Sequence, residues 1–146
     1  MASAIRHLAI RADTDDIRPA SAWLETTGSE FDIPAEQVFR LDLCLNEALG
    51  NIICHGGSSA REAPVLLALA VSTGVDECRA ALSVSDTGIP FNPLHAEAKL
   101  LAPSLAEATP GGLGLTMIAS YCDHLDYEFR DGRNTLTFDI RWEAPR

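Results

Sequence analysis

Apolar side chains recur at steps of three and four residues between positions 38 and 52, the spacing of one face of an α-helix. The residues in this pattern are Val38, Leu41, Leu45, Ala48, Leu49 and Ile52. Pro34 precedes the pattern and Gly56 follows it, so we expect one long amphipathic helix between these residues. A second helical pattern begins at Ile17 and predicts a shorter helix that ends at Gly28.

Five shorter stretches have the apolar runs or the strict alternation that are typical of β-strands. They comprise residues 4–12, 64–72, 78–86, 125–130 and 135–142. Asp131-Gly132 lies between the last two and predicts a hairpin with one buried face. The order of elements predicts a two-layer α/β sandwich. About three helices, the third of them running to about Cys122, would cover one face of a mostly antiparallel, mixed sheet of about five strands.

The stretch from residue 89 to residue 110 contains four prolines and no sustained apolar period. The pattern allows a short helix near residues 94–101. We expect the remainder to be a mobile connection, because a compact domain rarely keeps so long a loop without a function.

Length and composition indicate one globular domain, with 146 residues, 47% hydrophobic and 22% charged. The net charge of −10 argues against nucleic acid or an anionic membrane as the main partner, because phosphate-rich surfaces attract Lys and Arg. The four cysteines show no metal-binding spacing, so we expect reduced thiols in the cytoplasm. No signal peptide and no long apolar run are seen, so nothing predicts export or membrane spanning.

Asp86 falls on the apolar parity of the stretch 78–86, and the sequence Asp-Thr-Gly then ends this strand. Alternate residues of a strand face opposite sides of the sheet, so the parity predicts a carboxylate directed toward the covered side. A buried carboxylate is costly without a hydrogen-bond donor, which the protein or a ligand must supply.

Glu47 and Asn51 lie one helical turn apart and off the apolar stripe, so an acid and an amide project together from the long helix. Taken alone, the pair is more typical of a solvated helix surface than of a site. The run Gly111-Gly-Leu-Gly-Leu115 lacks the spacing of a P-loop or of a dinucleotide-binding turn. Glycines before a helix let backbone N–H groups approach an anion, although a flexible hinge explains this run equally well.

Together and in this order, the Glu47/Asn51 pair, the Asp86-x-Gly88 turn and the run 111–115 resemble the three ATP-site boxes of the GHKL superfamily. This superfamily joins DNA gyrase, MutL and histidine kinases in the Bergerat fold. The resemblance predicts a single GHKL-type ATP-binding domain over residues 1–146, with an ATP lid at about residues 90–110.

Within the superfamily, the amino-acid sequence of three stretches is similar to that of the anti-sigma-factor serine/threonine kinases of bacterial partner switching. The stretches are residues 86–93, 111–118 and 126–138. The whole resemblance spans roughly residues 5–142.

The resemblance implies a role for each matched residue. Asn51 would bind Mg²⁺ through its amide oxygen, and Glu47 would act as general base on the incoming hydroxyl. Asp86 would accept a hydrogen bond from the adenine amino group, and Gly88 would let the backbone pass close to the base. The other candidates for ATP binding are Gly111, Gly112, Leu113, Gly114 and Leu115 at the lid hinge, and either Asn134 or Thr135 near the adenine.

Basic residues are scarce near the expected phosphates. No Arg occurs between Arg79 and Arg130, and Cys54 stands where many relatives carry a basic residue. Phosphoryl transfer depends on neutralising the phosphate charge, so Mg²⁺ and backbone amides would supply most of it unless Lys99, Arg40 or a partner's Arg contributes. ATP binding is therefore better supported than rapid transfer.

We expect an ATP- and Mg²⁺-dependent protein serine/threonine kinase that phosphorylates a small antagonist protein and sequesters a sigma factor, as a cytoplasmic homodimer. The chief alternative is a non-catalytic nucleotide-binding module that sequesters a partner protein. A histidine-kinase catalytic domain is disfavoured because no helix with a phosphoacceptor His precedes the first strand. A general ATPase is disfavoured because the chain carries no transducer domain.

Overall fold

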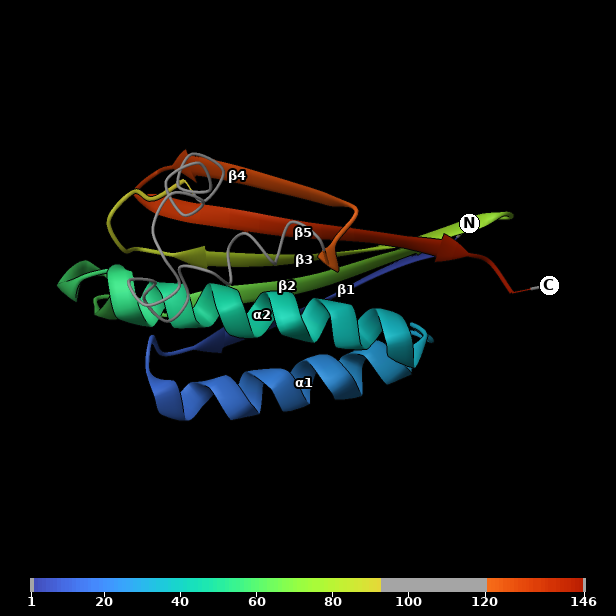
Figure 1. The fold of residues 1–146 in the computed structure, drawn as a ribbon, viewed down its shortest axis with the longest axis horizontal. Coiled ribbons are helices and arrows are strands. Elements are labelled where there is room, and N and C mark those ends of the chain that lie inside the picture. Colours follow the sequence, from blue (N-terminus) through green and yellow to red (C-terminus); the bar gives the residue numbers. More distant parts are fainter. Residues whose placement is uncertain (1, 93–120, 146) are drawn as a thin grey trace, which may run out of the picture.

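The computed structural model describes residues 2–92 and 121–145 (Figure 1). Four predictions therefore lie mostly or wholly outside the described residues: the short helix near residues 94–101, the ATP lid, the glycine-rich run and the third helix.

Five strands and two α-helices form the described part of the chain. The strands are β1 (Ala2–Ile10), β2 (Val65–Thr73), β3 (Glu77–Asp86), β4 (His124–Arg130) and β5 (Arg133–Glu143), and the helices are α1 (Ile17–Glu30) and α2 (Ala35–His55). Short 3₁₀ helices precede α1 at Thr14–Asp16 and follow α2 at Ser58–Arg61. In the described ranges, no helix is long and apolar enough to cross a membrane.

The strands form one sheet in the order β1-β2-β3-β5-β4, and all four pairings are antiparallel. Both helices lie side by side across one face of this sheet, which gives two layers (Figure 1). The two-layer α/β sandwich is thus confirmed. The described helices number two where the sequence predicts about three, because most of the third expected helix falls outside the described residues.

The core lies between the sheet and the helices. Alternate residues of β2 and β3 are buried against the helical layer. They pack with the apolar face of α2, and the fully buried side chains include Leu41, Leu45, Leu49, Leu67, Leu69, Leu82, Phe138 and Ile140. Burying one such side chain contributes about 1.5–3 kcal/mol, so this packing fixes the helix that carries Glu47 and Asn51 on the sheet.

Gly28 does not end α1, contrary to the sequence-based prediction. The helix continues to Glu30, and Gly28 is buried in its last turns. A Cβ atom on Gly28 would lie only 2.7 Å from Cγ2 of Val38 on α2. The glycine therefore serves the close approach of the two helices rather than the end of one of them.

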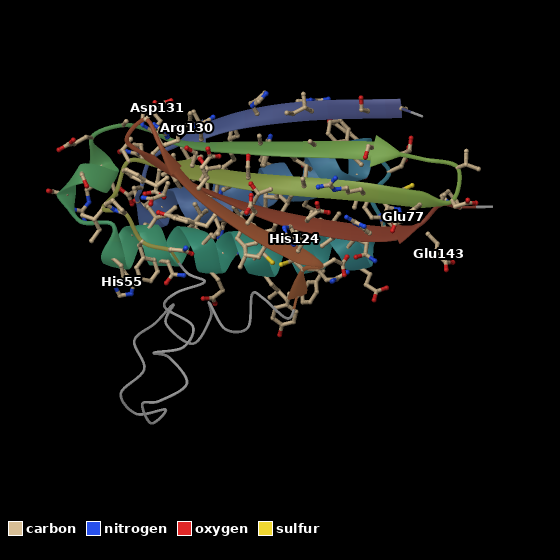
Figure 2. The ribbon with its side chains drawn as sticks, turned by 90° about the horizontal axis from the view of Figure 1, so that it is seen from above. His55, Glu77, His124, Arg130, Asp131 and Glu143 are labelled. Carbon is tan, nitrogen blue, oxygen red and sulfur yellow. The ribbon has the colours of Figure 1, made fainter. Side chains whose placement is uncertain are left out.

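The described residues that the sequence suggests for an ATP site lie toward one end of the molecule. His55, at the end of α2, lies at the same end as Asp131 in the β4–β5 turn, whereas Glu77 at the start of β3 marks the opposite end (Figure 2). The antiparallel register places Asp86, the last residue of β3, directly opposite Asn134 near the start of β5.

Candidate functional site

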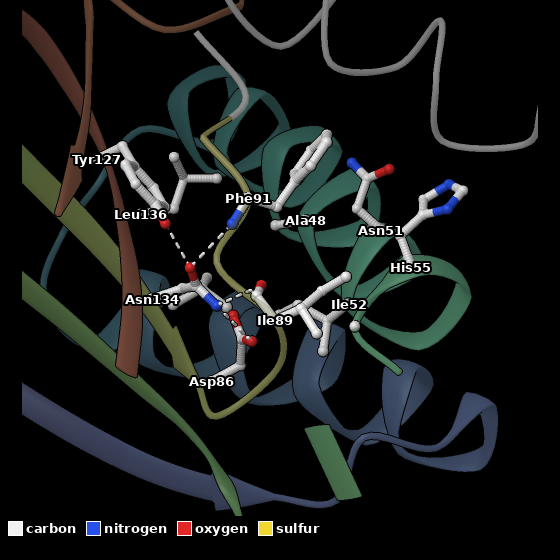
Figure 3. A pocket seen from close by; sticks show the side chains of 12 residues that line it. Ala48, Asn51, Ile52, His55, Asp86, Ile89, Phe91, Tyr127, Asn134 and Leu136 are labelled. Carbon is white, nitrogen blue, oxygen red and sulfur yellow. Dashed lines mark hydrogen bonds between the residues drawn. The ribbon is translucent and has the colours of Figure 1, made fainter. Parts of the chain in front are cut away.

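A pocket opens between the last turns of α2, the end of β3 and the β4–β5 hairpin (Figure 3). Its lining is mostly apolar, with a few polar side chains that converge on it. The lining residues are Ala48, Asn51, Ile52, His55, Gly56, Val84, Asp86, Ile89, Phe91, Tyr127, Asn134 and Leu136. This combination of an apolar wall and a few placed polar groups is typical of small-molecule sites.

Asp86 directs a buried carboxylate into this pocket, as its parity in the strand predicts. The residue is only 7% exposed. Its Oδ1 accepts hydrogen bonds from the Gly88 backbone N–H (2.8 Å) and from Asn134 Nδ2 (3.2 Å). Burial raises the pKa of Asp86, and these two hydrogen bonds oppose that rise because they favour the charged form.

Asn134 connects Asp86 with the loop that follows β3. Its Nδ2 also lies 3.2 Å from the Gly88 carbonyl oxygen and 3.1 Å from that of Ile89. Its Oδ1 accepts a hydrogen bond from the Phe91 N–H (3.3 Å) and another from the Tyr127 hydroxyl (Figure 3).

The sequence leaves open whether Asn134 or Thr135 lies near the adenine, and the structure places the two residues differently. Asn134 is 6% exposed and lines the pocket, whereas Thr135 is half-buried and is not among the described lining residues. Thr135 pairs with Ser85 and therefore faces the opposite side of the sheet.

Gly88 lets the loop after β3 pass directly over the end of α2. A Cβ atom on Gly88 would lie 2.8 Å from Asp86 Oδ1 and 3.0 Å from both Cα and the carbonyl oxygen of Gly56. The next residue, Ile89, donates its backbone N–H to that same carbonyl oxygen at 3.0 Å. A side chain at position 88 would meet backbone atoms that cannot move aside, so the close contact requires glycine.

Asn51 presents an unsatisfied amide. The residue is 7% exposed, and within the described ranges neither its Oδ1 nor its Nδ2 has a hydrogen-bond partner. Leaving a buried polar group unpaired costs about 1–3 kcal/mol, so such a group in a pocket is readily explained by a ligand that pairs with it. No cluster of three or more His, Cys, Asp or Glu side chains that could hold a metal occurs in the described ranges.

Glu47 lies one turn before Asn51 on α2 and is half-buried. It is not among the described residues that line the pocket. The structure thus brings together Asn51, Asp86 and Asn134, with Gly88 beside Asp86, and leaves Glu47 outside the described lining. The glycine-rich run 111–115 lies outside the described residues.

Positive charge is scarce around this pocket, as the sequence indicates. Its described lining contains no Lys or Arg. Arg40 is held elsewhere, because its guanidinium donates to the Tyr121 carbonyl oxygen (2.8 Å) and to Gln37 Oε1 (2.7 Å). It also lies eleven residues before Asn51, about 16 Å along the helix axis. Lys99 falls outside the described residues, and Cys54 is exposed.

His55 does line the pocket, on the same face of α2 as Asn51 (Figure 3). Tyr127 and Phe91 belong to the site as well, although no motif in the sequence marks them. The alternation in the hairpin places Tyr127 on the covered face of the sheet. Its hydrogen bond to Asn134 depends on the pairing of Tyr127 with Leu136, which periodicity alone does not give.

Comparison with known proteins identifies the family of the chain. The sequence profile of the histidine kinase-like ATPase domain matches residues 10–140. The chain belongs to this family. The resemblance to the GHKL superfamily predicted from the sequence is therefore confirmed.

One relative and one solved structure are informative. It is 35% identical over 115 residues to the serine/threonine-protein kinase BtrW of Bordetella bronchiseptica, an alignment that covers 79% of this chain and 78% of that protein. Its fold matches the crystal structure of the RsbU and RsbW domains of Rv1364c from Mycobacterium tuberculosis, with a TM-score of 0.60 and 15% identity. That match covers 97% of this chain and 33% of the longer one.

Proposed function

We propose that the protein is an ATP- and Mg²⁺-dependent protein serine/threonine kinase of the partner-switching type. It would act in the cytoplasm as a homodimer, phosphorylate a small antagonist protein, and sequester a sigma factor when it is not doing so. The observation that carries this proposal is the pair of polar groups at the two sides of one pocket, the unsatisfied amide of Asn51 and the buried carboxylate of Asp86. The similarity to a protein named a serine/threonine kinase supports the choice of reaction.

Asp86 would recognise the adenine. In the described part of the chain, both hydrogen bonds to its carboxylate end on Oδ1, so Oδ2 can accept a hydrogen bond from the exocyclic amino group. The apolar wall, which includes Ile52, Val84 and Leu136, would contact the faces of the base. Gly88 would keep the backbone close enough for this contact.

Asn51 fits a divalent cation that is bound together with the phosphates. Its amide oxygen is buried in the pocket wall and has no hydrogen-bond partner among the described residues, and oxygen ligands suit Mg²⁺. Bound Mg²⁺ would neutralise charge on the phosphates. The residues that would complete the phosphate site are Gly111, Gly112, Leu113, Gly114 and Leu115, whose N–H groups remain candidates on sequence grounds.

Glu47 would be the general base. It stands one helical turn before Asn51, so a hydroxyl that approaches the phosphates bound at Asn51 would come within its reach. A carboxylate in this position would take the proton of the attacking serine or threonine hydroxyl as its oxygen bonds to the γ-phosphorus of ATP and the bond from that phosphorus to the departing ADP breaks.

A second candidate function is a non-catalytic nucleotide-binding module that sequesters a partner. Two observations favour it: the described lining of the pocket contains no Lys or Arg, and it does not include Glu47. Such a module would need the nucleotide to order its partner surface but would transfer no phosphate.

One experiment separates the two functions. The protein is purified with its bound partners and incubated with γ-labelled ATP and Mg²⁺, with EDTA and Glu47→Gln as controls. The kinase proposal expects label on a serine or threonine of a co-purifying protein, and loss of that label in both controls. A protein that binds ATP in calorimetry but labels no partner would contradict the kinase proposal and favour the module.

A further inference from the structure

We propose that Asn134 is a positioning residue that fixes the orientation of Asp86, and so sets the selectivity of the pocket for the amino group of adenine. The proposal rests on the proposed function in that ATP is taken as the ligand. It adds a residue whose effect on base selectivity is exerted through Asp86.

The hydrogen bonds of Asn134 already use the whole of its amide. Its Nδ2 lies within 3.2 Å of three acceptors, namely Asp86 Oδ1 and the carbonyl oxygens of Gly88 and Ile89. Its Oδ1 accepts from two donors, the Phe91 N–H and the Tyr127 hydroxyl. A side-chain amide offers two N–H donors and two lone pairs, so no capacity is left for a nucleotide.

The surroundings of Asn134 also fix which way its amide points. Three acceptors surround the nitrogen and two donors surround the oxygen, so a flipped amide would face oxygen with oxygen and N–H with N–H. A threonine here could not span both groups, because it has one hydroxyl and a shorter reach. An aspartate would keep the acceptor side and lose the donor side.

Two consequences follow for Asp86. Asn134 and the Gly88 N–H hold Oδ1, which leaves Oδ2 for the ligand. Burial raises the pKa of Asp86, and the bond from Asn134 opposes that rise because it favours the ionised carboxylate. An ionised carboxylate can only accept a hydrogen bond, which suits the amino group of adenine and opposes the carbonyl oxygen of a 6-oxopurine.

The same amide connects Asp86 to the backbone of residues 88–91. Asn134 contacts a carbonyl oxygen or an N–H of Gly88, Ile89 and Phe91. One side chain therefore holds both the carboxylate that would bind the adenine amino group and the loop that follows β3. Removing the amide should loosen both together.

A first test uses the nucleotide-free protein. NMR would measure the titration of the Asp86 carboxyl and the hydrogen exchange of the Gly88 and Phe91 amides, in the parent and in Asn134→Ala. We expect a higher pKa for Asp86 and faster exchange at both amides. In Asn134→Asp, the acceptor for the Phe91 N–H survives, so Phe91 should stay protected while the pKa of Asp86 rises through repulsion between the two carboxylates. Unchanged titration and exchange in both variants would overturn the proposal.

A second test measures base selectivity as the ratio of the Kd values for inosine triphosphate and ATP. Loss of one hydrogen bond that orients Asp86 should reduce this ratio by about three- to tenfold in Asn134→Ala. The reduction should vanish when Asp86→Asn is already present, because Asn134 acts through Asp86. Thr137→Val, on the same strand but on the opposite face of the sheet, is the matched control and should leave the ratio unchanged.

The outcomes are distinguishable. If Asn134→Ala fails to fold, Tyr127→Phe removes only the hydroxyl that donates to Asn134 and should shift the ratio in the same direction by a smaller factor. A ratio that is unchanged in every variant that folds, or that falls equally in the Asp86→Asn background, would overturn the role in selectivity. A parent that binds neither nucleotide would overturn the selectivity and the proposed function together, and the nucleotide-free titration would still decide whether Asn134 positions Asp86.

Discussion

Gly88 and Gly56 bring two backbones into direct contact: a Cβ atom on Gly88 would lie 3.0 Å from both Cα and the carbonyl oxygen of Gly56. Gly56 caps α2, and its own N–H donates to the Ile52 carbonyl oxygen at 2.8 Å. The loop after β3 therefore packs directly against the end of the helix that carries Asn51. The geometry of the pocket depends on this contact.

Replacing Gly88 by Ala should damage both folding and nucleotide binding. The added methyl group meets Asp86 Oδ1 and the Gly56 backbone, so the loop must move away from α2. We expect a loss of about 1–3 kcal/mol in the free energy of unfolding, as for other overpacked sites, and at least a tenfold weaker affinity for ATP. Urea unfolding and calorimetry would measure the two effects.

Gly50→Ala is a matched control on α2. Nothing lies within 4 Å of a Cβ atom at position 50, and alanine is the better helix former, so this variant should gain about 0.5–1 kcal/mol of stability. Its ATP affinity should match that of the parent. A stable Gly88→Ala variant with full ATP affinity would mean that the loop after β3 has no part in the site.

Asp86→Asn should separate stability from binding. The Asn oxygen can still accept from Gly88 and Asn134, while its amide nitrogen presents a donor to the donor of the adenine amino group. We expect the affinity for ATP to fall by roughly 1–3 kcal/mol. Calorimetry with ATP checks this, and an affinity equal to that of the parent would remove Asp86 from the site.

The same variant should report the raised pKa of Asp86 through the pH dependence of stability. A raised pKa means that the folded protein binds a proton more tightly than the unfolded chain. Asp86 therefore supports folding most at low pH, and this contribution is lost as the pH rises from the unfolded pKa through the folded one. Relative to the parent, Asp86→Asn should gain stability across that window, as measured by urea unfolding at a series of pH values. A constant difference would contradict the assigned burial.

Asn51→Ala should abolish the response to Mg²⁺ and cost little stability. In the described ranges the amide of Asn51 has no hydrogen-bond partner, so its removal breaks none of the bonds that hold the fold. We expect Mg²⁺ to tighten ATP binding in the parent and in Asn51→Asp, which keeps an oxygen ligand, but not in Asn51→Ala. Titration of ATP with and without Mg²⁺ would measure this.

Asn46→Ala is the control for that experiment. Asn46 lies on the same helix, and its Nδ2 donates to the carbonyl oxygen of Asp42 at 2.7 Å. This variant should lose a modest amount of stability and keep the full Mg²⁺ response. An Mg²⁺ response that survives in Asn51→Ala would show that the cation binds elsewhere.

Local patterns predict the elements of this fold well, because long amphipathic helices and alternating strands are decided largely by their own residues. The parity that directs Asp86 to the covered side is such a local property. The residues at which elements begin and end are predicted less accurately. The first strand spans Ala2–Ile10 rather than residues 4–12, and Gly28 lies inside α1 because of Val38, a contact that only the packed structure reveals.

The composition of the site could be predicted only in part, since it depends on pairings between distant residues. Asn134 and Asp86 are 48 positions apart, and a register shifted by one residue would bring Thr135 to the pocket instead. Arg40 shows the reverse case. The sequence offers it as a cation for phosphate, whereas the fold uses its guanidinium on the Tyr121 carbonyl oxygen and on Gln37.

Glu47→Gln decides between the kinase and the non-catalytic module. Glutamine keeps the size and the hydrogen bonding of glutamate but cannot take a proton, so ATP binding should survive in this variant. If Glu47 is the general base, transfer to the partner should fall by roughly two to four orders of magnitude. Glu47 is not among the described lining residues of the pocket, which makes this the most demanding of the predictions, because the hydroxyl of a docked partner must reach both Glu47 and the nucleotide. Label transfer that is equally fast in the parent and in Glu47→Gln would assign the base to another residue, whereas a parent that never transfers label would leave a nucleotide-dependent binding module.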